Sequence, residues 1–159
     1  MNNNTDNRDN EISPYQLEEF QKRIHKLFQC CQERTQYQSE RFDLPDAELR
    51  CLLHFGDERY MTPTKLARKM NVAKSRVTKV IGRLIKRGLV AKVKDPADSR
   101  YHLLSLTPAG QNKFNEISQF TKKIHSEILG QIPLEQRNVL LTYLNLLETS
   151  MESVKDLMW

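Results

Sequence analysis

Basic residues crowd the middle of the sequence without an acid among them. From Lys65 to Lys94 there are 11 Lys or Arg residues and no Asp or Glu. The whole chain of 159 residues has 25 basic and 20 acidic side chains, for a net charge of +5, so the rest of the chain is net acidic. Ammonium and guanidinium groups gathered in one stretch attract phosphates, whereas carboxylates would repel them. The window therefore predicts a phosphate-binding surface, and the alternative is an ordinary solvated basic face.

Apolar spacing within this window predicts a helix from about Lys74 to Arg87. Val77, Ile81 and Leu84 follow one another at helical spacing and form its core face. We expect the remaining polar side chains to point wholly or partly outward: Lys74, Ser75, Arg76, Thr78, Lys79 and Arg83.

An α-helix fits the major groove of B-DNA, where base edges carry the sequence. Arg76 is the predicted bidentate partner of guanine O6 and N7, and the Ser75 and Thr78 hydroxyls are predicted to contact bases. Lys79 and Arg83 are predicted to contact phosphates, which fix register without reading sequence.

Cysteine and histidine residues suggest no catalytic or metal chemistry. Cys30, Cys31 and Cys51 give an odd number of thiols, two of them adjacent, which indicates a reducing compartment and no disulfide framework. We expect all three thiols to be packed in the interior. The alternatives are a peroxide switch, or a zinc site of Cys51 and His54 with His25 or Cys30.

The chain lacks the local motifs of the common enzyme classes. It has no Gly-rich phosphate loop, nucleophile elbow or His-Glu-x-x-His pattern, so we expect no enzyme, no metal and no cofactor. It also has neither a secretory signal nor an apolar run long enough for a membrane span. These features predict a cytoplasmic protein that does not engage membranes.

Start and stop signals divide the chain into elements around the basic helix. Each of three helices is expected to open on a Ser or Thr followed by Pro, at Ser13, Thr62 and Thr107. A shorter helix is expected over 45–55, and two strands over 89–94 and 101–106. The order helix, helix-turn-helix and hairpin is that of a winged helix-turn-helix.

The loop between the two predicted strands carries a further candidate pair. Arg100 follows Asp98 by two residues at the hairpin tip, so Arg100 is predicted to enter the minor groove while Asp98 holds the wing. The alternative is a solvated surface ion pair, which contributes little.

The middle third resembles the MarR family of bacterial transcription regulators. The matching segments, at the family's spacing, are Leu66-Ala67, Ser75 to Lys79, Arg83-Leu84, Arg87 to Val90, Asp95 to Arg100 and Leu106 to Gly110. Three positions depart from the usual pattern: Ala73 replaces a capping residue, Gly82 replaces an Asp, and Pro45 replaces a Thr. None of the three removes a predicted DNA contact.

The resemblance implies a fold, an assembly and a function. The fold is mainly α with a small β-wing, in which long N- and C-terminal dimerisation helices flank the winged helix-turn-helix. The expected organisation is a disordered polar tail over 1–12, a dimerisation region over 13–40 and 108–157, and a DNA-binding domain over 43–107. A lengthwise apolar seam in the last helix agrees with this: Leu140, Leu144, Leu147, Met151, Val154 and Met158.

The expected function is sequence-specific binding of double-stranded DNA. The resemblance implies a homodimeric repressor on a palindromic operator, with a possible small-molecule effector of unknown identity. The alternative is a winged-helix interaction module whose basic face docks an acidic protein.

Overall fold

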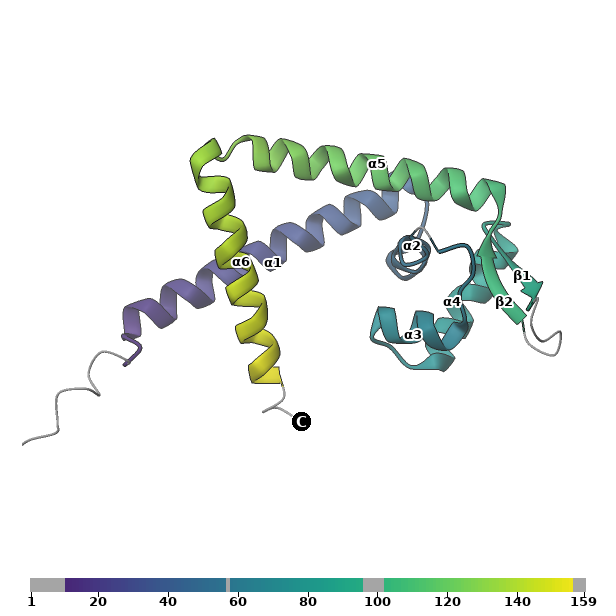
Figure 1. The fold of residues 1–159 in the computed structure, drawn as a ribbon, viewed down its shortest axis with the longest axis horizontal. Helices are drawn as coiled ribbons and strands as arrows, with labels where there is room; N and C mark the ends of the chain where they lie inside the picture. Colours follow the sequence, from purple (N-terminus) through teal and green to yellow (C-terminus); the bar gives the residue numbers. More distant parts are fainter. Residues whose placement is uncertain (1–10, 57, 96–101, 156–159) are drawn as a thin grey trace, which may run out of the picture.

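The computed structural model describes residues 11–56, 58–95 and 102–155 (Figure 1). The chain is mainly helical with one small antiparallel sheet, as the sequence predicts. In order, the elements are α1 (Pro14–Phe42), α2 (Asp46–Leu53), α3 (Pro63–Met70), α4 (Lys74–Lys86), β1 (Val90–Lys94), β2 (His102–Leu106), α5 (Pro108–Gly130) and α6 (Leu134–Lys155). Most of the predicted tail lies outside the described residues.

The three predicted Ser/Thr-Pro helix starts are confirmed. The Ser13 hydroxyl accepts the backbone N–H of Gln16, whose side chain in turn accepts the Ser13 N–H, which completes a capping box. Thr62 and Thr107 each accept the backbone N–H three residues further on. Hydroxyl caps satisfy N–H groups that the helix itself leaves unpaired, so α1, α3 and α5 begin where the sequence indicates.

The turn of the helix-turn-helix depends on one left-handed residue. Asn71 ends α3 with φ at 52°, a conformation that Asn tolerates better than most residues. Gly88, with φ at 72°, lies just past the end of α4 and directs the chain into the wing. Ala73 and Pro45 provide no side-chain cap for α4 and α2, as their residue types dictate.

The wing is a two-stranded antiparallel pair with Val90 opposite Leu106 and Lys94 opposite His102. A third backbone segment joins it, because Met61 and Leu104 exchange both N–H to carbonyl hydrogen bonds, at 2.9 and 2.8 Å. The sequence did not indicate this bridge. It fixes the wing to the chain that leads into α3.

The main core lies between α2, α3, α4, the wing and the first half of α5. Its fully buried side chains come from each of these elements and include Leu52, Leu66, Val77, Leu84, Leu104 and Ile117. The predicted core face of α4, Val77, Ile81 and Leu84, is therefore confirmed. This core positions α4 with one face held and the other face open.

The long helices α1, α5 and α6 extend away from this core (Figure 1). α1 contacts α5 through a hydrogen bond of 2.9 Å from Gln38 to Thr121 and a stacked pair of Tyr37 and Phe120. α6 contains no buried residue, although its sequence is rich in Leu. Within the described ranges, none of these helices is long and apolar enough to cross a membrane.

Candidate nucleic-acid interface

The outward face of α4 is an open basic surface of the winged domain. Val77, Ile81 and Leu84 are at most 4% exposed and anchor the helix to the core. The six predicted contact residues all have exposed side chains: Lys74, Ser75, Arg76, Thr78, Lys79 and Arg83. The structure thus brings these predicted residues onto one helix surface, while their contacts with DNA stay predictions.

The first turn of α4 adds to the positive field of this surface. The turn contains no acidic residue, and no side chain caps it. Free backbone N–H groups and the helix dipole at an N-terminus both attract anions such as phosphates. Lys74, Arg76 and Lys79 form no ion pair with any residue of the described ranges, so their charges are available to a ligand.

The Thr78 hydroxyl is already engaged with the backbone of its own helix. Thr78 donates its hydroxyl hydrogen to the carbonyl oxygen of Lys74 at 2.9 Å, so this hydroxyl is left as an acceptor. Thr78 would therefore accept from a base amino group, such as cytosine N4 or adenine N6.

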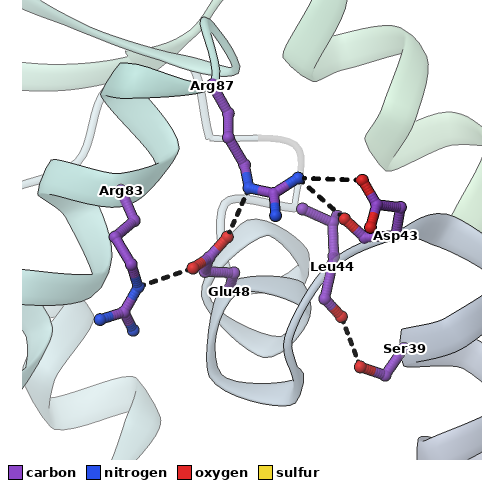
Figure 2. A network of polar contacts seen from close by, with 6 residues as sticks. All are labelled: Ser39, Asp43, Leu44, Glu48, Arg83 and Arg87. Atoms are coloured by element: carbon purple, nitrogen blue, oxygen red, sulfur yellow. Dashed lines mark hydrogen bonds and ion pairs between the residues drawn. The ribbon is translucent and has the colours of Figure 1, made fainter.

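A buried carboxylate, Glu48, holds the C-terminal half of α4 (Figure 2). Glu48 lies on α2 and its side chain is 1% exposed. Its Oε1 accepts the Nε–H of Arg83 at 2.6 Å, and its Oε2 pairs with Nε of Arg87 at 3.0 Å. Arg83, predicted as a phosphate contact, is thus also part of an ion pair inside the protein.

Arg87 continues this network toward α1. Its Nη1 donates to the backbone carbonyl of Asp43 at 2.9 Å and to the Asp43 carboxylate at 3.3 Å. Asp43 is the left-handed residue that ends α1, and the adjacent turn is closed by a hydrogen bond of 2.6 Å from the Ser39 hydroxyl to the Leu44 carbonyl. The network therefore links the end of α1 to the end of α4 through α2.

Sequence reasoning missed Glu48. Its acidic type indicates a solvated position, but Glu48 precedes Cys51 and Leu52 by three and four residues, so all three share the buried face of α2. That placement on an apolar face was the available signal, because a buried carboxylate needs cationic partners.

A second carboxylate, Glu58, neutralises part of the basic window. Lys65 and Lys69 of α3 both pair with it, the latter at 2.7 Å. The hydrogen bond from Lys65 has the largest effect, and together with that from Lys69 it holds the pKa of the Glu58 carboxyl below its ordinary value. Two basic side chains of α3 are therefore already paired inside the protein, whereas, within the described ranges, Lys74, Arg76 and Lys79 of α4 are not.

The predicted wing contacts, Asp98 and Arg100, lie outside the described residues. The strands that flank them are in place, and Lys92 and Lys94 of β1 are exposed. The minor-groove contact of Arg100 and the supporting role of Asp98 remain predictions.

The cysteines divide into two kinds, which corrects one expectation. Cys51 is fully buried, and burial, followed by the charge of Glu48, raises the pKa of its thiol to about 12. Cys30 and Cys31 are exposed, so the prediction that they are packed in the interior is wrong for this chain. Helical spacing places Cys31 on an apolar stripe of α1, but no segment within the described ranges covers Cys31.

No three His, Cys, Asp or Glu side chains in the described ranges lie close enough together to hold a metal ion. The zinc site considered from Cys51, His54 and His25 or Cys30 is therefore not assembled.

A groove of about 670 Å³ lies between α1 and α2. It is lined by Phe28, Cys31, Gln32, Thr35, Gln36, Ser39, Glu40, Asp46 and Arg50.

Comparison with known sequences finds similarity to bacterial transcription regulators. Residues 42–100 match the sequence model of the MarR family. The HTH-type transcriptional regulator YdgJ of Bacillus subtilis is 25% identical over 141 residues, which cover 89% of this chain and 80% of YdgJ. The HTH-type transcriptional repressor MdtR of the same organism is 28% identical over 120 residues, which cover 76% of this chain and 77% of MdtR.

Comparison with solved structures supports the fold. Streptococcus pneumoniae FabT, in a crystal structure in complex with DNA, superposes with a TM-score of 0.76. The two chains are 19% identical, and the match covers 85% of this chain and 99% of FabT.

Proposed function

We propose that this chain is a DNA-binding transcription regulator of the MarR family, whose sequence model its residues 42–100 match, and that it acts as a homodimeric, ligand-responsive repressor in the cytoplasm. Its site would be a palindromic operator, with one winged helix-turn-helix on each half. A dimer of this kind places two recognition helices in successive major grooves on one side of the duplex.

The observation that carries the proposal is the open, acid-free face of α4. Lys74, Arg76 and Lys79 are exposed and unpaired within the described ranges, on a helix that the core holds by its opposite face. In the proposed complex Arg76 reads a guanine, Ser75 and Thr78 contact bases, and Lys74, Lys79 and Arg83 bind phosphates. Arg100 would enter the minor groove beside the recognition helix, supported by Asp98.

Large apolar side chains on the long helices support the homodimer. On α1, Leu17, Phe20, Leu27 and Phe28 are about half exposed or more, and on α6 Leu144, Met151 and Val154 are 47 to 56% exposed. Contiguous apolar surface of this kind marks an interaction site. A second copy of the same chain offers the matching surface on both helices, as a two-fold interface requires.

The groove between α1 and α2 supports a response to a ligand. Its volume suits a small molecule, and it is lined by both apolar and charged groups. Its wall includes Ser39 and Asp46, which flank the turn that joins the proposed dimerisation helix to the DNA-binding domain. A ligand there would change how the two parts are set relative to one another, and so the spacing of the two recognition helices.

Selection from random DNA tests the proposal. The purified chain is mixed with random duplexes at physiological salt, and bound fragments are sequenced. We expect an enriched inverted repeat with half-sites about 10 base pairs apart. Folded protein that enriches no sequence would contradict the proposal and favour an acidic protein as the partner of α4.

A further inference from the structure

We propose that Glu48 is a positioning residue for DNA binding, which holds Arg83 through Nε so that the two terminal nitrogens of Arg83 are presented to a DNA phosphate. The inference rests on the proposed function, since it assigns a role within the same protein–DNA interface. It adds a buried residue of α2 to a surface otherwise made by α4 and the wing.

The two edges of the Arg83 guanidinium have different surroundings. Its Nε–H donates to Glu48 at 2.6 Å, whereas its terminal nitrogens form no hydrogen bond or ion pair with another residue of the described ranges. The Arg83 side chain is 52% exposed, and Figure 2 shows its terminal nitrogens on the side away from Glu48. A guanidinium has five N–H donors in a rigid plane, so fixing one edge also fixes the direction of the other.

Glu48 is buried between its two arginine partners. The carboxylate is 1% exposed, and Arg87 Nε forms an ion pair with its other oxygen at 3.0 Å. A buried carboxylate without cationic partners is costly, so Glu48 retains its hold on both guanidinium groups. Arg83 is consequently ordered before DNA arrives, and binding costs less side-chain entropy than it would for a freely rotating arginine.

The sign of the effect separates positioning from simple electrostatics. A negative charge beside DNA opposes binding, so removing any acid from α2 should by itself tighten the complex. If Glu48 positions Arg83, replacing Glu48 weakens the complex although the protein becomes more positive. This opposite sign is the signature of the proposed role.

Glu48→Gln and the matched control Asp46→Asn test the proposal. Both remove one negative charge from α2, but Asp46 is about half exposed and faces Arg50 at 4.0 Å instead of Arg83. We measure affinity for the selected operator duplex across a range of salt concentrations, with thermal unfolding as a check on folding. Glu48→Gln is expected to bind about tenfold more weakly, with a salt slope smaller by about 2 for the dimer, because each protomer loses about one phosphate contact. Asp46→Asn should bind as well as the unmodified chain or slightly better.

A second variant keeps the test decisive if Glu48→Gln folds poorly. Arg83→Gln leaves Arg87 on Glu48 and should show the same loss of affinity and salt slope. In the double variant the loss should not add, because both changes remove one contact.

Three results would overturn the proposal. Glu48→Gln could bind as tightly as Asp46→Asn, or Arg83→Gln could leave the affinity and salt slope unchanged, or the two losses could add in the double variant. In each case the unmodified chain still binds its operator and the proposed function stands. An unmodified chain that binds no duplex would overturn both.

Discussion

Replacing Leu144 on α6 tests the proposed homodimer. This side chain is 47% exposed in the single chain and lines an apolar groove with Leu147 and Met151. Fully burying a leucine stabilises by about 1.5–3 kcal/mol, and about half of Leu144 remains to be covered, which leaves about 1 kcal/mol per side chain. Two-fold symmetry counts the residue twice, so Leu144→Ala should weaken the dimer by about 2 kcal/mol, or about 30-fold in Kd.

A charged replacement at the same position should abolish the dimer. Leu144→Glu would put a carboxylate into the apolar seam one turn before Glu148, where the two charges repel. The winged domain should stay folded, because α6 contributes no buried residue to it. The expected product is a helical monomer with poor operator affinity.

Sedimentation equilibrium with circular dichroism measures both effects. Thr149→Glu is the matched control, since Thr149 is exposed and lies about 140° around the helix from Leu144. The control should remain dimeric. If Leu144→Glu is also dimeric and binds operator normally, the α6 seam is not the interface and the reasoning is refuted.

Three further predictions concern the winged domain and the start of α5 that packs on it. Arg76→Ala should remove about 1–3 kcal/mol of discrimination at one base pair, whereas Lys79→Ala should weaken all operator variants alike; equal losses across single-base variants for Arg76→Ala would assign it to a phosphate. Gly110→Ala should strongly destabilise the fold, because its Cβ would lie 1.9 Å from a backbone oxygen, while Gly82→Ala, with no neighbour within 4 Å, should stabilise α4 by up to about 1 kcal/mol; thermal unfolding of both variants decides. The Cys51 thiol, whose pKa is raised to about 12, should react with a thiol reagent at pH 8 only on unfolding, and rapid labelling of the native protein at Cys51 would contradict its burial.

Local signals in the sequence predicted most of the winged domain. Hydroxyl caps before Pro fixed three helix starts, and the spacing of Val77, Ile81 and Leu84 separated the two faces of α4. These features depend on residues within a few positions of one another, so the sequence is sufficient to predict them. The exposed face of α4 followed directly from its buried face.

Features that depend on distant residues could not be predicted in the same way. The face of α2 hints that Glu48 is buried, but its partners Arg83 and Arg87 lie far along the chain. Likewise, Met61 joins the wing only because β2 lies beside it. The exposed Cys31 shows a different limit, since periodicity reveals an apolar stripe but not whether the same chain covers it.

Relative affinity for two duplexes tests the central claim, sequence-specific DNA binding by α4, most directly. One duplex carries the selected inverted repeat, and the other has the same composition with both half-sites scrambled, both at physiological salt. Specific binding predicts an affinity ratio of about 10³ or more in favour of the repeat. Equal affinity for the two duplexes would contradict the claim.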